Sequence, residues 1–215
     1  MAGPEAAQVL SLIRATISSL KSIEEVHCDA SDAESLPPAF PAVAKHLRVV
    51  YDALETAQKQ IRQRNDDSTC GEMKPTAAEC KEKASRLEGV FLQVVPSAVD
   101  KRKESYREAV HEASTGKDNR VEVIMKGIIE DVRLLLMVDE EMKTAAALQL
   151  GTLAEAMREV STIPLSLPVE NPASGIHNYG PGPQNVNLGG GSQYNNYRGQ
   201  QFVGGTFHGF NPSHS

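Results

Sequence analysis

Residues 40–61 read FPAVAKHLRVVYDALETAQKQI. Apolar residues recur in this stretch at alternating steps of three and four positions, which places them on one face of an α-helix. A seam of this length is typical of a helix that packs lengthwise in a bundle. Proline is tolerated only in the first helical turn, so Pro41 predicts a helix that begins between Pro38 and Phe40. The apolar face consists of Phe40, Val43, Leu47, Val50, Leu54, Ala57 and Ile61.

Stretches on both sides of this segment repeat the same spacing. An earlier helix is expected from Pro4 to about Val26, because proline favours the first helical position. Further helices follow until Pro164 and Pro168 end helicity. We therefore predict an all-α fold, a bundle of about five to six helices over residues 1–162. The later helices are expected at about 76–95, 97–113, 119–137 and 140–162.

Side chains that can accept a hydrogen bond from the first turn mark where these helices begin. Asp139 stands before two glutamates, whose charge suits the N-terminal end of a helix dipole. Residues 65–74 are polar and are expected to form a loop ahead of the third helix. The predicted capping pairs are Thr76 with Glu79, Ser97 with Asp100, and Asn119 with Glu122.

The helix at 4–26 is apolar on more than one face, because Val9 and Leu12 widen its stripe. A helix of this kind is usually central to a bundle. The alternative is a segment that contacts a membrane once chains have assembled. Arg14 interrupts the apolar run, so no segment is long and apolar enough to span a bilayer. The candidate membrane contacts are Leu10, Ile13 and Ile17.

Charge and cysteine usage exclude several classes of protein. Residues 171–215 carry one Lys, Arg, Asp or Glu side chain, Arg198, so the net charge of −6 for the whole chain leaves −7 on an acidic body, the first 170 residues. That body has no basic cluster and is not expected to bind nucleic acid. Cys28, Cys70 and Cys80 are odd in number and lack a close CxxC spacing, which favours a reducing, intracellular compartment.

No group of residues in the first 170 positions suggests catalysis, a metal site or a cofactor site, so an enzyme is not expected. Cys80 falls on the apolar face of its helix and is expected to be a core residue rather than a nucleophile. The basic run Lys101, Arg102 and Lys103 is expected to form a solvated face. The histidines of this region lie on different predicted elements; they are His27, His46 and His111.

Residues 178–204 contain a nine-residue repeat: NYGPGPQNV, NLGGGSQYN and NYRGQQFVG. A period of nine is too short for a helical hairpin and fits a short strand with a turn. Asn, Gln and aromatic side chains stack on identical copies when strands align in register, so the repeat favours a disordered tail that converts to cross-β structure. A passive tail of low complexity is the alternative. The residues expected to carry the motif are Asn178, Tyr179, Gly180, Gly182, Gln184, Asn187, Gly189, Gly191, Gln193, Asn195, Asn196, Tyr197, Phe202 and Phe207.

This tail resembles the sigma-type amyloid signalling motif of filamentous fungi, found next to NACHT-class receptors. The resemblance rests on Ile176-His177-Asn178, on two Gly-x-Gly-x-Gln blocks at 180–184 and 189–193, and on the segment 201–207. It implies that a matching motif on a receptor templates the tail into amyloid. The expected organisation is a helical domain at 1–162, a linker at 163–175, the motif at 176–210 and a disordered end at 211–215.

The body resembles a second family. Residues 35–47, SLPPAFPAVAKHL, are similar to the Leu-Pro-x-Ala-Phe and Val-Ala-x-x-Leu opening of the SesA-type domain. That domain is the helical N-terminal part of fungal NACHT and other P-loop NTPase receptors, and the resemblance extends to about residue 160. Together the two resemblances imply an effector of programmed cell death and heterokaryon incompatibility, working with an NLR (STAND) receptor. The chain shows no P-loop, so we expect it to receive the signal.

Two other functions stay open at this point. The helical domain could be a protein–protein interaction adaptor with a passive tail. A prion-like protein of RNA granules is suggested by the Gly, Asn and Tyr content and opposed by the acidic body. For the effector, the expected partners are a NACHT receptor with a matching motif, further copies through the tail and, after assembly, a membrane. Its expected location is the cytoplasm, with the plasma membrane as the destination after activation.

Overall fold

The computed structural model describes residues 3–30, 35–63, 66–111 and 118–167. Within these ranges the chain forms seven α-helices and no β-strand, which confirms the predicted all-α class. All of them belong to one compact unit, Met1–Pro168. The helices are α1 (Pro4–Cys28), α2 (Ala39–Gln63), α3 (Asp67–Val94), α4 (Arg102–His111), α5 (Val121–Leu136), α6 (Glu140–Ala145) and α7 (Ala147–Thr162).

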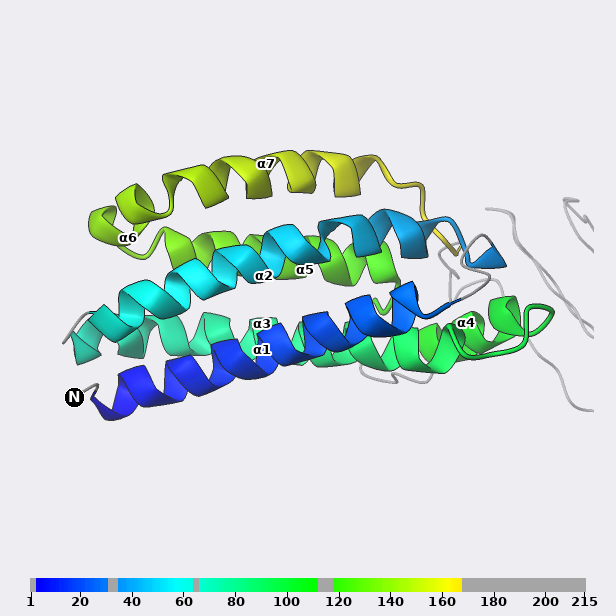
Figure 1. Cartoon of the computed structure of the whole chain (residues 1–215), viewed down its shortest axis with the longest axis horizontal. Helices are drawn as coiled ribbons and strands as arrows, with labels where there is room; N and C mark the ends of the chain where they lie inside the picture. The colour runs from blue at the N-terminus through cyan, green and yellow to red at the C-terminus, as the bar shows by residue number, and fades with distance from the viewer. Residues whose placement is uncertain (1–2, 31–34, 64–65, 112–117, 168–215) are drawn as a thin grey trace, which may run out of the picture. The chain divides into compact units, whose positions relative to one another are not determined.

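The long helices lie alongside one another (Figure 1). α1 packs against α2 and α3, and α3 packs on its other side against α5. α7 covers α2 and α5, and the short α6 leads into it. Each long helix turns its apolar stripe toward its neighbours, so the stripes merge into one hydrophobic core.

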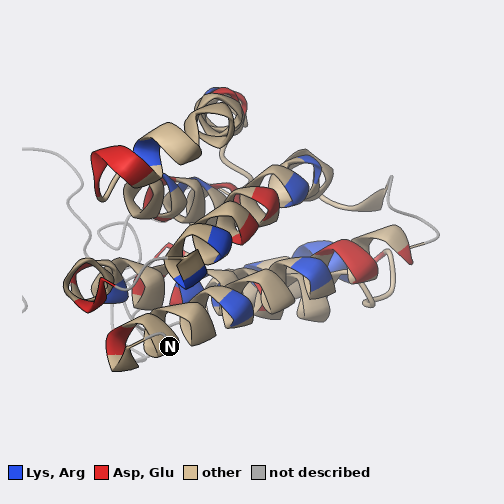
Figure 2. Cartoon of the chain, turned by 60° about the vertical axis from the view of Figure 1, so that its left-hand side comes forward, with Lys and Arg blue, Asp and Glu red and all other residues tan. Residues whose placement is uncertain are grey.

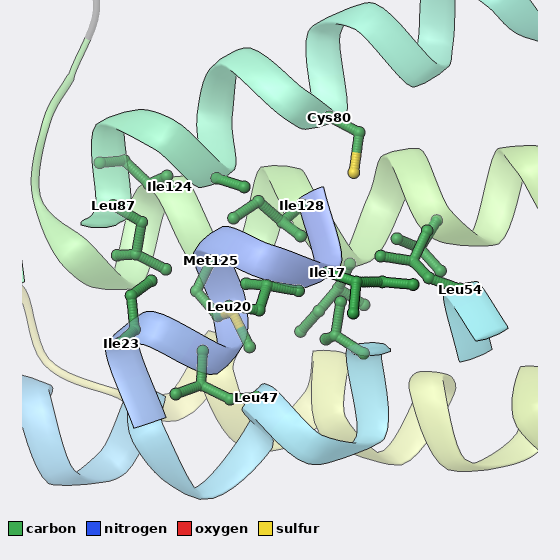
Figure 3. Packing of buried hydrophobic residues seen from close by; sticks show 14 of the residues in the cluster. Ile17, Leu20, Ile23, Leu47, Leu54, Cys80, Leu87, Ile124, Met125 and Ile128 are labelled. Atoms are coloured by element: carbon green, nitrogen blue, oxygen red, sulfur yellow. The ribbon is translucent and has the colours of Figure 1, made fainter. Parts of the chain in front are cut away.

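The core contains the whole predicted face of α2, and no residue of that face is more than 1% exposed. α1 begins at Pro4 and ends two residues beyond the expected Val26. Of the two residues that widen its stripe, Val9 is fully buried and Leu12 is partly buried against the core. α1 is therefore a core helix, as predicted from the apolar residues on more than one of its faces. Figure 3 shows core side chains meeting from four helices. Those labelled are Ile17, Leu20 and Ile23 of α1, Leu47 and Leu54 of α2, Cys80 and Leu87 of α3, and Ile124, Met125 and Ile128 of α5.

The beginning of α3 was wrongly predicted. The helix starts at Asp67, nine residues before Thr76, and Pro75 lies inside it. Proline in a helix interior costs about 3 kcal/mol. Burial of an apolar side chain stabilises the folded state by about 1.5–3 kcal/mol. α3 buries Cys70 and Met73 in this first part. Packing therefore outweighs the local cost of Pro75.

The start of α3 also joins the start of α1. Asp66 caps α3 by accepting from the backbone N–H of Ser68 at 3.0 Å. Asp67 accepts from the backbone N–H of Ala6 at 3.0 Å, so it satisfies one of the unpaired donors of the first turn of α1. These bonds explain why a polar stretch expected to be a loop is helical instead.

The predicted sixth helix is divided. Asp139 caps α6 as expected, accepting from the N–H of Met142 at 2.7 Å. The helical backbone stops at Ala146 and resumes as α7 in a new direction (Figure 1). Met142 and Ala146 are both fully buried. The bend lets these two side chains reach the core while α7 lies along α2 and α5.

Protonation of the partly buried His27 and the buried His46 is expected to destabilise the fold. Burial lowers the pKa of His27 and of His46 below the ordinary 6.5. The unfolded chain then binds more protons below pH 6.5, so the stability that these groups contribute is present above that pH and is lost as pH falls through the folded pKa values. We expect the free energy of unfolding in urea to fall between about pH 7.5 and about pH 5.5. The variant His27→Asn/His46→Asn should flatten that dependence, and an equally steep slope in the variant would contradict this.

Candidate functional site

The residues predicted to form the amyloid motif, Asn178 to Phe207, lie outside the described part of the chain. The predicted membrane contacts Leu10, Ile13 and Ile17 are described. They are 5%, 1% and 8% exposed and face the core between α2 and α3. Contact with a bilayer would therefore require α1 to leave the bundle. None of the described helices has the length and hydropathy to cross a membrane.

The structure reveals a different polar site where the chain leaves α7. We call residues 163–167 the exit segment. Its Ser166 donates a hydrogen bond from the backbone N–H to Glu122 at 2.8 Å, and its hydroxyl lies 2.8 Å and 2.9 Å from the two carboxylate oxygens of the same residue. Glu122 belongs to the first turn of α5 and is 4% exposed. A buried carboxylate with three such contacts fixes the exit segment to α5.

Tyr106 of α4 extends this network. Its hydroxyl lies 2.6 Å from the Ser166 hydroxyl and accepts from the backbone N–H of Val121 at 3.2 Å. The Ser166 hydroxyl donates to Glu122 and the Val121 N–H donates to the Tyr106 hydroxyl, so the Tyr106 hydroxyl donates its own hydrogen to Ser166. Burial raises the pKa of Tyr106 to about 12. Its ring packs edge-on against that of Phe40, with the two ring centroids 5.0 Å apart. Tyr106 is therefore a neutral donor held in place by the core.

Arg120 anchors the end of the exit segment. Its Nη1 donates to the carbonyl oxygen of Leu167 at 3.1 Å, and its Nε donates to both oxygens of Asp118 at 2.9 Å. The hydrogen bonds from Arg120 hold the pKa of Asp118 below its usual range. Arg86 of α3 donates to Asn119 at 2.9 Å, so the turn before α5 is tied to a second helix.

This arrangement corrects the predicted cap of α5. Asn119 was expected to cap the helix with Glu122, yet Arg120 is the N-cap and makes no side-chain cap bond. Asn119 binds Arg86 and Glu122 binds Ser166 instead. Hydrogen bonds to charged groups are stronger than the neutral capping bonds they replace, so these distant partners prevail over local capping.

Arg102 was expected on a solvated basic face and is instead 4% exposed. Its Nη2 donates to the carbonyl of Val95 at 2.9 Å, its Nε to the carbonyl of Ser97 at 3.2 Å, and its Nη1 to the hydroxyl of Ser35. It thereby satisfies carbonyls at the C-terminal end of α3, where a cation suits the helix dipole. Its neighbours Lys101 and Lys103 are exposed, as predicted.

Ser97 also has a different role from the predicted one. α4 begins at Arg102, so Ser97 and Asp100 do not cap it. The Ser97 hydroxyl donates to the carbonyl of Gln93 at 2.8 Å and therefore helps to close α3. Residues 98–101 form a turn between the two helices. The exit segment and this turn border a hollow of about 340 Å³, which Arg102 and Tyr106 also line.

The polar side chains of this site hold the exit segment against the start of α5. The described residues contain no cluster of three His, Cys, Asp or Glu side chains that could bind a metal ion. Cys80 is buried, and burial raises its pKa to about 12, so its thiol is protonated and belongs to the core as predicted. His46 of α2 lies 3.5 Å from Glu159 of α7, a pairing of helices that its position in the sequence did not indicate.

Sequence reasoning missed the exit-segment site because its partners are far apart in the chain. Ser166 lies 44 residues from Glu122 and 60 residues from Tyr106. One local signal was present: Arg120 and Glu122 flank the buried Val121 at the start of an otherwise apolar helix. Charged residues at such positions need partners once buried.

Comparison with known proteins gives one match. The family model SesA, described as the N-terminal domain on NACHT NTPases and P-loop NTPases, matches residues 13–135, more than half of the chain. The matched residues reach from α1 to the end of α5 and include Arg102, Tyr106, Arg120 and Glu122. No curated protein and no solved structure matches the chain.

Proposed function

The chain belongs to the SesA family of N-terminal domains on NACHT NTPases and P-loop NTPases, and from this premise we propose that it is a non-catalytic effector of an NLR-type receptor. The observation that carries the proposal is the nine-residue repeat at 178–204, which follows a helical domain of this family. In this proposal a receptor with a matching motif templates the tail into cross-β structure. The helical domains are then concentrated along the fibril and act together.

The exit segment supports coupling between the tail and the bundle. Ser166 and Leu167, which belong to the predicted linker ahead of the tail, are bonded to Glu122 and Arg120 of the α5 region. In this proposal, restraint of the tail in a fibril would reach the helical domain through these bonds. Clustering through the tail would raise the local concentration of the helical domains by linkage alone, without a new contact.

The proposed setting is the cytoplasm of a fungal cell, with programmed cell death and heterokaryon incompatibility as the outcome. Membrane contact through Leu10, Ile13 and Ile17 is proposed only for the assembled state, because these side chains are buried in the bundle. Acidic substitutions at these positions would unfold the domain before any membrane assay. Leakage of dye-loaded vesicles is therefore compared between fibrils and monomers of the unaltered chain, and equal leakage from both would refute a membrane step that depends on assembly.

The order of the tail residues is expected to control seeding. Full-length protein should form fibrils with cross-β diffraction, and preformed fibrils should seed fresh monomer. Gln193→Pro removes a backbone donor from each layer of the stack, and Asn187→Asp/Asn196→Asp places like charges above one another. Both changes should abolish seeding in a thioflavin-T growth assay. Ser213→Pro, beyond the repeat, is the matched control and should seed normally.

A scrambled tail separates this function from a passive one. The variant keeps the composition of residues 176–210 and loses the register of Asn, Gln and Tyr. It should neither seed nor be seeded by fibrils of the native order. If the scrambled chain seeds as well as the native one, composition alone explains the tail, and an adaptor function of the helical domain becomes the better explanation.

A further inference from the structure

A basic groove lies on the surface between α1 and α2, and none of its lining residues belongs to the exit segment. Its volume is about 490 Å³. Arg14 and Lys21 contribute from α1, and Lys59 and Arg62 contribute from α2. Glu55 is the one carboxylate that lines it. The groove therefore has an excess of three positive charges.

This excess contrasts with the rest of the molecule. The chain carries a net charge of −6, and acidic and basic residues are interspersed over the helices (Figure 2). Glu55 is paired with Lys21 at 3.1 Å. Among the described residues, no carboxylate lies within ion-pair distance of Arg14, Lys59 or Arg62 in the groove. Unpaired like charges side by side raise the energy of the groove unless an anion neutralises them.

Gln58 gives an independent sign of a missing acceptor. It lines the same groove, and its Oε1 accepts from Nη2 of Arg62 at 2.8 Å. That bond fixes the orientation of the amide. The other amide atom, Nε2, is buried and has no hydrogen-bond acceptor among the described residues. Buried donors normally have a partner. An oxygen of a bound ligand would supply one.

We propose that the groove binds an anion that carries two or more phosphate groups. Arginine presents a planar fork that matches phosphate oxygens, and lysine adds a compact charge. A single phosphate would neutralise only part of the excess, whereas neighbouring phosphates could contact cations from both helices. Such an anion could be a soluble polyphosphorylated small molecule or the headgroup of a lipid. A lipid would bring the intact bundle to a membrane surface without exposing the core face of α1.

Binding is tested on the full chain with three probes. Inositol hexakisphosphate and inorganic phosphate are titrated by calorimetry at low salt. Vesicles of phosphatidylcholine, with and without a phosphatidylinositol bisphosphate, are used in flotation. We expect saturable binding of the hexakisphosphate that weakens as salt is added, and much weaker binding of inorganic phosphate. Flotation only with the bisphosphate lipid identifies a headgroup as ligand, and binding of the free compound without flotation identifies a soluble one.

Matched charge reversals make the test specific. Lys59→Glu/Arg62→Glu changes two cations of the groove and should weaken binding at least about tenfold, because phosphate contacts dominate the affinity of such sites. Lys81→Glu/Lys126→Glu makes the same change of net charge on α3 and α5 and should leave the affinity within about twofold. The milder Arg14→Gln/Lys59→Gln replaces the pair if the reversal unfolds the chain in circular dichroism. Equal loss in the groove and control variants, or no binding of any probe, would overturn the proposal.

Discussion

Leu47→Asp and Leu54→Asp are each expected to unfold the helical domain. Both leucines lie in the centre of the α2 seam and are no more than 1% exposed. Loss of the leucine side chain alone costs about 2–5 kcal/mol, and burial of an unpaired carboxylate adds several more. Domains of this size are stable by about 5–15 kcal/mol. Far-UV circular dichroism should therefore show a large loss of helix, with no cooperative thermal transition.

The control for this prediction lies next to Leu47 on the same helix. Arg48 is exposed and makes only a long i,i+4 contact of 4.0 Å with Asp52. Arg48→Asp should change the free energy of unfolding by less than about 1 kcal/mol. Native helicity and melting in both leucine variants would show that α2 does not pack as described.

Arg102→Ala is expected to lower the free energy of unfolding by about 2–4 kcal/mol, because hydrogen bonds to a charged group are removed and buried carbonyls lose their donor. Those carbonyls belong to Val95 and Ser97 at the end of α3. For a domain of this length, the melting temperature should fall by about 5–15 °C. Urea unfolding and calorimetry measure both quantities.

The flanking lysines provide matched controls. Lys101→Ala and Lys103→Ala remove the same charge from exposed positions and should each change stability by less than about 0.5 kcal/mol. Arg102→Lys keeps the charge but lacks the fork that reaches several oxygens at once, so it should recover only part of the loss. Equal effects at all three basic positions would mean that the run is a solvated face, as its composition alone suggested.

The repeated spacing of apolar residues was enough to predict which faces are buried. The residues of the predicted apolar face of α2, from Phe40 to Ile61, and Cys80 of α3 are all buried in the core as expected. The reason is physical: helix geometry maps steps of three and four onto one side, and only one side of a surface helix can avoid water. The first residues of α1 and α2 followed from proline rules that act within one turn.

Predictions that depended on polar residues were less successful. Ser97 and Asn119 were expected to cap helices, and 65–74 was expected to be a loop. A polar side chain has several acceptable partners, and its own neighbours in the sequence do not reveal which one the fold brings close. Glu122 and Arg102 each form hydrogen bonds with partners that only tertiary packing brings close.

Local sequence patterns were sufficient for the helical class, the core faces and the repeat that distinguishes the tail, because each is encoded by residues within a few turns or repeats of one another. Tertiary structure alone decided that Ser166 binds Glu122, that Asp67 satisfies the first turn of α1, and that four cations from α1 and α2 line one groove. The first two contacts join residues that are 44 and 61 positions apart in the sequence. Their free energy exists only once the helices have packed, so no local pattern records them.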